Sequence, residues 1–270
     1  TVDNGQAFFN SKNVLQADTL TVEGLALSEI DSTNDSMVTD YQLNTDSLAL
    51  TDGADNGNVT VSVDPRPISS IEATKVYNAS VLLDGTVATT MGNLVAGESF
   101  TVRSGELDAN NVGANGSNFI KTITLQSASA SLDNYSFTVT PENVADGAVK
   151  LDFGDELLTS AEDGFSNAAT ILKRDLVITP VDDGKLKGEG DPAGYLGVTY
   201  NGLVPSEAPE DAFSELPGVD RIRVTDDQGG GPENAVGLYE DSLVVEGGVA
   251  KNYNLLRETG DFEIYPEGFI

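Results

Sequence analysis

Apolar and polar residues alternate along most of this chain, and this alternation limits the folds that are open to it. Ile123 and Leu125 are flanked by threonines, and Phe262 and Ile264 enclose Glu263. A period of two gives a β-strand one apolar and one polar face, as in half-buried antiparallel sheets. Turn-forming sequences separate the alternating segments: Asp52-Gly53, Asp84-Gly85, Asn115-Gly116, Asp183-Gly184 and Gly229-Gly230-Gly231. Helical periodicity is weak and confined to 160–172 and 206–216, so we expect a mainly β protein.

The composition excludes most catalytic machinery. The 270 residues contain no Cys, His or Trp, which rules out Ser-His-Asp and Cys-His nucleophile systems, ordinary zinc sites and disulfides. Paired carboxylates can hydrolyse glycosidic bonds, but no motif marks such a pair here, and the chain has no Trp to line a sugar cleft. We therefore expect no enzyme activity and no cofactor, apart from calcium.

The charge balance bears on partners and location. Fourteen Lys and Arg residues against 44 Asp and Glu residues give a net charge of −30, which repels nucleic acid and anionic membrane surfaces. Apolar runs such as 81–83 are far shorter than the ~18–20 residues of a membrane-spanning helix. An acidic, cysteine-free composition rich in Asn, Gly, Ser and Thr is typical of a secreted bacterial surface protein. The start at Thr1 rather than Met is typical of a processed or excerpted chain.

Three sequence marks recur in the same order, which predicts a tandem array. The first mark is an Asn-Val pair: Asn13-Val14, Asn111-Val112 and, in relaxed form, Asn234-Ala235-Val236. The second is an Asx-Tyr pair: Asp40-Tyr41, Asn134-Tyr135 and Asn252-Tyr253. The third is an alternating strand that ends in proline: 61–65, 176–180 and 262–266. We expect Asn or Asp to start a strand and the following tyrosine ring to fill a core.

The middle of the chain resembles the YDG repeat of bacterial filamentous haemagglutinin-type adhesins. The matching segments are Lys75-Val76-Tyr77-Asn78-Ala79-Ser80, Leu94-Val95-Ala96-Gly97-Glu98, Asn111-Val112-Gly113 and Asn134-Tyr135. Residues 176–266 resemble the related MBG ("mostly β-grasp") repeat through 176–179, Gly190-Asp191-Pro192, Tyr200-Asn201-Gly202-Leu203, Val236-Gly237 and Asn252-Tyr253. The resemblance implies tandem β-grasp-like or β-sandwich-like modules in a secreted stalk or fibre, without a catalytic role.

We therefore expect three modules, arranged end to end as an extended rod. The first module covers residues 1–64 and matches only the C-terminal half of a YDG repeat, with Leu15 in place of the expected glycine. The second covers 65–175 and the third covers 176–270, with stiff linkers at 65–67 and 173–180. A half-repeat leaves strands without partners, so we expect β-strand addition from a neighbouring copy, with its segment after Pro266 or strands of its last module as the donor. The alternative is that the missing half precedes Thr1 in a longer polypeptide.

Calcium is the one metal that the sequence favours, because carboxylate oxygens are the ligands it prefers. The candidate ligands are Asp52, Asp55, Asp182, Asp183, Asp191, Asp226 and Asp227. Neither the EF-hand spacing nor a glycine-aspartate nonapeptide repeat is present. The alternative interpretation is that these residues are solvated turn residues of a β-protein.

Two classes of function follow from these observations. The first is a structural subunit or stalk segment of an extracellular fibre, with copies of the chain as partners. The second is an adhesin module that binds a carbohydrate or a surface receptor. Tyr41, Tyr135 and Tyr253 occupy repeat positions and are expected in the core. A patch of exposed aromatic residues would favour binding, and Tyr77, Tyr195, Tyr200 and Tyr239 are its candidates.

Overall fold

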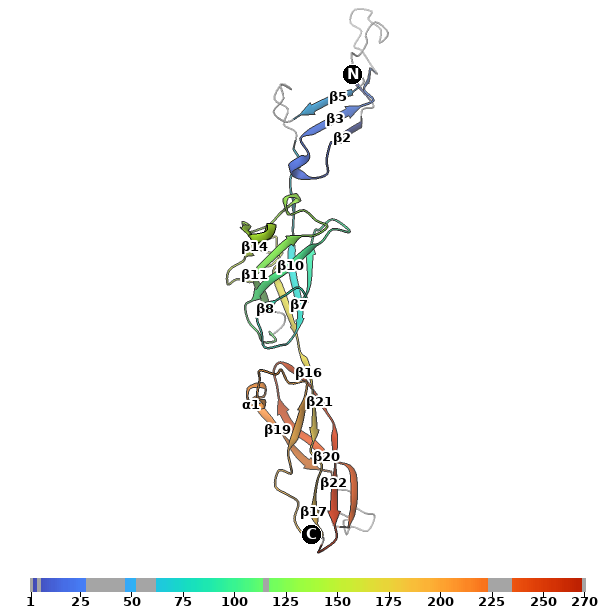
Figure 1. The fold of residues 1–270 in the computed structure, drawn as a ribbon, viewed down its shortest axis with the longest axis vertical. Coiled ribbons are helices and arrows are strands. Elements are labelled where there is room, and N and C mark those ends of the chain that lie inside the picture. The colour runs from blue at the N-terminus through green and yellow to red at the C-terminus, as the bar shows by residue number, and fades with distance from the viewer. Residues whose placement is uncertain are drawn as a thin grey trace, which may run out of the picture.

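The computed structural model describes residues 2–3, 6–27, 47–51, 62–113, 117–222 and 235–268, and these residues are mainly β (Figure 1). The one α-helix in these ranges, α1 (Pro209–Ala212), is a single turn that starts at a proline. Residues 160–172, the other helical candidate, form turns and then strand β15. No helix in the described ranges is long and apolar enough to cross a membrane.

The first module contains two small sheets. Its elements are β1 (Val2–Asp3), β2 (Gln6–Phe9), the 3₁₀ turn η1 (Val14–Gln16), β3 (Thr19–Glu23), β4 (Ala26–Leu27) and β5 (Ser47–Thr51). β3 lies between β2 and β5 with antiparallel pairing on both sides, and β1 pairs with β4. Among the described side chains of this module only Ala17 is buried. These strands therefore form a sheet with little core of its own.

The second module is an eight-stranded curled sheet with a small two-stranded pairing beside it. Its elements are β6 (Arg66–Pro67), β7 (Ser70–Val76), β8 (Leu82–Leu83), β9 (Ala88–Gly92), β10 (Phe100–Leu107), β11 (Asn118–Ser127), η4 (Leu132–Asn134), β12 (Tyr135–Ser136), β13 (Glu142–Val144), η5 (Ala145–Gly147), β14 (Ala148–Asp152) and β15 (Ala168–Leu172). The main path runs β13-β14-β11-β15-β7-β9, and β10 pairs with both β11 and β8. Alternation along β7 and β11 buries Ile71, Ile120, Ile123 and Leu125 completely.

The third module consists of two sheets. Its strands are β16 (Arg174–Pro180), β17 (Asp183–Leu186), β18 (Val198–Asn201), β19 (Glu215–Arg221), β20 (Gly237–Val249), β21 (Tyr253–Arg257) and β22 (Thr259–Tyr265). One sheet has the order β18-β16-β21 and the other has the order β17-β22-β20-β19.

In both larger modules the last strand pairs in parallel with a strand from the first half of the module. β7 runs parallel to β15 in the second module, and β17 runs parallel to β22 in the third. Upstream of these pairs, β6 lies parallel to β12 and β16 lies parallel to β21. A parallel pair brings residues from the two ends of a module together, so most of the structure depends on contacts far apart in sequence.

One hydrophobic core runs from the second module into the third. It contains Ile120 and Leu151 in the second module, Leu176 and Tyr253 in the third, and Tyr77 between them. A separate small core surrounds Phe262 in the lower part of the third module. The second and third modules therefore share apolar packing.

Several sequence-based expectations are wrong. Residues 173–180 are not a linker, because 174–180 form β16, whose Leu176 and Ile178 are fully buried. The strand expected at 176–179 is present, but it opens the third module instead of closing the second. The strand that corresponds to the closing strand β22 is β15, since each pairs in parallel with the first half of its module. Asp183-Gly184 lies in strand β17 rather than in a turn. The glycine is needed there because a Cβ would lie 2.5 Å from the Glu263 carbonyl oxygen.

Candidate functional site: the module junctions

Asparagine side chains join the first module to the second. The Val14 backbone N–H donates to Asn134 Oδ1 at 2.9 Å, and Asn134 Nδ2 donates to Asn13 Oδ1 at 3.1 Å. Asn13-Val14 starts the η1 turn of the first module, and Asn134 precedes β12 of the second. The Asn-Val mark and the Asx-Tyr mark of the sequence are therefore partners across a module boundary.

The second and third modules make the same contacts. The Val112 N–H donates to Asn252 Oδ1 at 2.9 Å, and Asn252 Nδ2 donates to Asn111 Oδ1 at 2.8 Å. At both junctions the side-chain amide of one asparagine therefore makes two hydrogen bonds to an Asn-Val pair. Its oxygen accepts from the valine N–H, and its nitrogen donates to the side chain of the asparagine in that pair. The backbone N–H fixes the orientation of the amide, because only the amide oxygen can accept its hydrogen bond.

The tyrosine after each asparagine is held by a valine and a glutamate of its own module. In the second module the Val95 N–H donates to the Tyr135 hydroxyl at 3.1 Å, and that hydroxyl donates to Glu98 Oε2 at 2.7 Å. Burial first, and then the hydrogen bond to Glu98, raise the pKa of Tyr135. The hydroxyl therefore stays protonated and acts as a donor to the carboxylate.

Tyr253 has the corresponding partners in the third module. It accepts from the Val204 N–H at 3.0 Å and donates to Glu207 Oε2 at 2.5 Å. Burial, followed by the hydrogen bond to Glu207, raises the pKa of Tyr253 to about 12. Both repeat-position tyrosines within the described ranges are buried, at 5% exposure for Tyr135 and 1% for Tyr253, which confirms their expected place in the core. Tyr41 lies outside those ranges.

An arginine on the opening strand completes each junction. Arg66 Nε donates to the Asn93 carbonyl at 2.7 Å, and Arg174 Nε donates to the Gly202 carbonyl at 2.7 Å. Both acceptor residues have a positive φ, of 65° for Asn93 and 105° for Gly202. Glycine suits the second position because a Cβ would lie 2.5 Å from the Asp175 carbonyl oxygen.

The second junction has one contact more than the first. Tyr77, at the end of β7, donates its hydroxyl to Glu207 Oε1 at 2.5 Å, and its ring meets the Tyr253 ring edge-on at 5.4 Å between centroids. Burial, together with Glu207, raises the pKa of Tyr77. Glu207 therefore receives one hydroxyl from each of two modules.

At the first junction, the corresponding space is a cavity. It has a volume of about 260 Å³ and is lined by Val14, Val63, Val95, Glu98 and Tyr135, among others. Tyr135 occupies one oxygen of Glu98, and no described side chain donates to the other. In the part of the chain that the structure describes, the first junction thus has the glutamate but no second tyrosine beside it.

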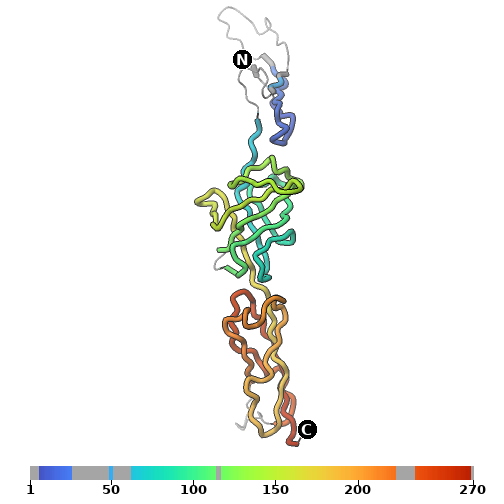
Figure 2. The backbone as a smooth tube through the Cα atoms, turned by 60° about the vertical axis from the view of Figure 1, so that its left-hand side comes forward, coloured from blue at the N-terminus to red at the C-terminus, as the bar shows by residue number. Residues whose placement is uncertain are grey.

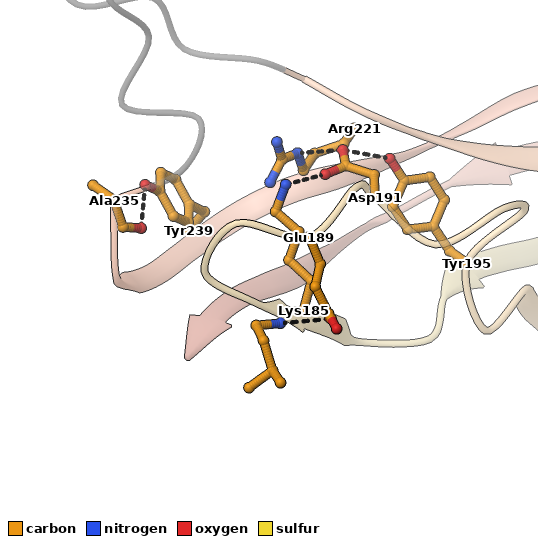
Figure 3. A network of polar contacts seen from close by, with 8 residues as sticks. Lys185, Glu189, Asp191, Tyr195, Arg221, Ala235 and Tyr239 are labelled. Atoms are coloured by element: carbon orange, nitrogen blue, oxygen red, sulfur yellow. Dashed lines mark hydrogen bonds and ion pairs between the residues drawn. The ribbon is translucent and has the colours of Figure 1, made fainter. Parts of the chain in front are cut away.

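A buried ion network lies in the third module, away from the junctions (Figure 3). Lys185 Nζ lies 2.7 Å from Asp191 Oδ1, and Arg221 Nε lies 3.1 Å from Asp191 Oδ2. The Tyr195 hydroxyl donates to Asp191 Oδ2 at 3.2 Å, and the Arg221 guanidinium lies over the Phe262 ring at 4.5 Å. Burial alone would raise the pKa of Asp191, but the two cations and Tyr195 outweigh burial and hold it below its usual range.

The calcium candidates are not gathered into a metal site in the described ranges, where no group of three or more metal-binding side chains lies together. Asp191 is held by two cations, Asp182 Oδ1 accepts from the Asp261 N–H, and Asp183 Oδ1 accepts from the Gly184 N–H. Asp182, Asp183 and Asp261 do line an open acidic cavity of about 400 Å³. The remaining candidates, Asp52, Asp55, Asp226 and Asp227, lie outside the described ranges.

The tyrosines considered for a sugar-binding patch do not form one. Tyr77 is buried at the second junction, Tyr195 packs edge-on against Phe262, and Tyr200 packs against Phe213. The Tyr239 hydroxyl donates to the Ala235 carbonyl at 2.9 Å. Within the described ranges the strongly exposed aromatic residues are instead Phe8 and Phe9, on β2 of the first module.

Sequence reasoning found some junction residues and missed others. The recurrence of Asn-Val and Asx-Tyr singled out four asparagines and two tyrosines of the junctions, but not the fact that the two marks face each other. It also missed Glu207, although Val95 and Glu98 have the same three-residue spacing as Val204 and Glu207. That spacing was the available signal.

Comparisons with known proteins add nothing to this geometry, since no family model, curated protein or solved structure matches the chain.

Proposed function

We propose that this chain is a structural segment of a secreted bacterial extracellular fibre or adhesin stalk, with tandem modules of the YDG and MBG kind. The observation that carries the proposal is the repetition of the junction. Five hydrogen bonds at the first junction, made by Asn134, Tyr135 and Arg66, recur with corresponding residues at the second. Selection for a repeated contact between modules is expected of a spacer, whose working property is the geometry of each module relative to the next.

The arrangement of the elements supports an extended rod. In both views the strands of the three modules follow one another along the long axis, and the marked chain ends lie at opposite extremes (Figures 1 and 2). The shared core around Tyr77 and Tyr253 restricts bending between the second and third modules. The parallel pairing of opening and closing strands is compatible with a β-grasp-like module.

The proposal assigns no catalytic group and no resident cofactor. The polar clusters of the described residues are structural: Asp191 binds two cations, and Glu98 and Glu207 accept tyrosine hydroxyls. The alternative function, binding of a carbohydrate or a host protein, is favoured by one observation, the exposure of Phe8 and Phe9.

The stiffness of the second junction tests the spacer function. Asn252→Ala removes the amide that bridges Val112 and Asn111, so the distribution of distances from small-angle scattering should broaden as the second and third modules bend. Asn254→Ala is the matched control, because Asn254 lies two residues further on, in β21, and its side chain bonds the exposed Asp175 of its own module. Equal scattering from both variants and the parent would contradict a role for this contact in stiffness.

Electron microscopy of the parent at rising concentration should show filaments that lengthen end to end.

A further inference from the structure

The first module has a strand edge that no described strand covers. β2 pairs with β3 on one side only, and its two aromatic residues, Phe8 and Phe9, are 44% and 41% exposed. Successive residues of a strand point to opposite faces, so one of these rings faces the side on which a core would form. Unpaired edges of this kind recruit further strands.

The second module contains the same hairpin in a covered form. Asn10 and Thr19 exchange two hydrogen bonds at the end of β2, and Asp108 and Phe119 exchange the same two bonds at the end of β10. The neighbouring pair in each hairpin therefore corresponds as well: Phe9 pairs with Leu20 as Leu107 pairs with Ile120.

The covered hairpin has one strand more than the hairpin of the first module. In the second module β8 pairs antiparallel with β10, and the Leu107 N–H donates to the Val81 carbonyl at 2.9 Å. Leu107 is then 1% exposed, whereas Phe9 at the corresponding position is 41% exposed. The described residues of the first module thus include no strand that corresponds to β8.

The cavity at the first junction marks a second missing piece. Residues 63–64 stand before Arg66 at the same spacing as residues 171–172 before Arg174, so the two segments correspond. In the second module, the Leu172 carbonyl accepts a hydrogen bond from the Tyr77 N–H at 2.9 Å. Tyr77 then extends along the junction to Glu207 and Tyr253. At the first junction the groups of the second module that correspond to these partners, Glu98 and Tyr135, line the cavity of about 260 Å³.

We infer that the first module is completed by a half-module of the kind formed by residues 66–98, which supplies two pieces. A strand like β8 pairs antiparallel with β2 and covers Phe9, and a strand like β7 ends in a tyrosine that fills the cavity and donates to Glu98. The inference rests on the proposed tandem-module function. The occupant is not residues 66–98 of another copy, because β7, β8 and β9 are already paired within their own module.

The experiment restores the missing half covalently. A second copy of residues 66–98 is attached directly before Thr1, which corresponds to Ser99 by the register of the two hairpins. Amide hydrogen exchange is then compared in the extended and the parent chain. The expected result is exchange at Phe9 that is slower by about tenfold or more in the extended chain. Exchange at Leu125 and Ile178, in the other two modules, should stay unchanged and serves as the internal control for folding.

Two variants of the extended chain localise the effect. Tyr77→Ala in the appended copy only should remove protection near Val95 and Glu98, because it empties the cavity again. Phe9→Glu should remove protection of β2, whereas Leu216→Glu, at an exposed position of β19, should not. Unchanged exchange at Phe9 in the extended chain would overturn the inference. So would protection that survives both Tyr77→Ala and Phe9→Glu.

The source of the half-module is tested on the parent chain alone. If Phe9 becomes protected as the concentration of the unextended chain rises, neighbouring copies supply the strand, which contradicts the occupant named above. The stiffness of the second junction does not depend on the first module, so a failed completion leaves the spacer test intact. A failed spacer test likewise leaves the exchange result at Phe9 interpretable.

Discussion

At the scale of single residues, two glutamates carry the polar part of the junctions. Glu207 accepts hydroxyls from Tyr253 and Tyr77, and Glu98 accepts a hydroxyl from Tyr135. A hydrogen bond to a charged group contributes about 1.5–3 kcal/mol, and a buried donor that loses its acceptor is costly. Because Glu207 connects two modules, its loss weakens both the module and the junction.

Replacement of these glutamates should therefore have graded effects. We expect Glu207→Ala to lower the free energy of unfolding of the second and third modules by about 3 kcal/mol, and Glu98→Ala to cost about half of that, because it frees one tyrosine hydroxyl instead of two. Glu162→Ala, at an exposed turn position, is the control and should cost less than about 0.5 kcal/mol. Urea unfolding followed by amide exchange in each module measures the difference. Equal losses for all three variants would contradict the assignment.

At the scale of elements, the buried ion network fixes the lower part of the third module. Lys185 lies on β17 and Arg221 on β19, which are the two outer strands of one sheet, and Asp191 lies in the segment that follows β17. Asp191 thus connects strands that do not pair with each other. Removal of one partner from such a buried group leaves uncompensated charge, which costs about 3–5 kcal/mol.

The depressed pKa of Asp191 predicts acid sensitivity of the third module. A carboxylate whose pKa is lower in the folded state stabilises the fold above its unfolded pKa of about 4, and the stabilisation is lost as the pH falls towards the folded value. Thermal unfolding of the third module, measured from about pH 6 down to about pH 2, should show this loss of stability. Asp191→Asn should unfold at a lower temperature than the parent at neutral pH, and its unfolding temperature should no longer fall as Asp191 is protonated. Asp220→Asn, at an exposed position beside Arg221, should behave like the parent.

At the scale of the whole molecule, the net charge of −30 opposes association of copies. Ion pairs among the described residues are few and mostly exposed, so little of this charge is neutralised internally. Salt at about 0.15 M screens charges beyond about 8 Å. Contacts between the ends of two copies therefore become less repulsive as the ionic strength rises.

Association should accordingly increase with salt. Light scattering is expected to report larger particles as NaCl is raised from about 0.01 M to about 0.15 M. Calcium chloride at matched ionic strength is the comparison. An equal response to both salts indicates screening, and a much larger response to calcium indicates specific sites, for which the acidic cavity around Asp182 and Asp261 is the first place to look. Association that weakens steadily with salt would mean that attraction between opposite charges holds the copies together.

The alternation of residues predicted much of the local structure. Ile123 and Leu125 are fully buried on β11, and Phe262 and Ile264 are fully buried on β22, as a period of two requires. Side-chain periodicity is a local property, because it depends only on the direction of successive Cβ atoms along an extended backbone. The burial of Tyr135 and Tyr253 was predicted for a related reason, since their sequence neighbourhood recurs.

The partners of each strand could not be predicted in the same way. Residues 176–180 have the alternation of a closing strand, yet they open the third module, because their neighbour β21 lies more than 70 residues later along the chain. Asp183-Gly184 has a turn sequence, yet close approach of the Glu263 backbone makes it a strand. Asp191 was a calcium candidate in the sequence, and nothing in the sequence marked Lys185 and Arg221 as the cations that folding places beside its carboxylate.

By itself, the sequence determined the strand faces around Ile123 and Phe262, the burial of Tyr135 and Tyr253, and the recurrence of the asparagine marks. Only the tertiary structure decided that those marks face each other across module boundaries, and that Glu207 joins Tyr77 to Tyr253. The physical reason is the parallel pairing of first and last strands. It brings together residues whose sequence separation carries no periodic signal, and the energy of such contacts appears only after the intervening chain has folded.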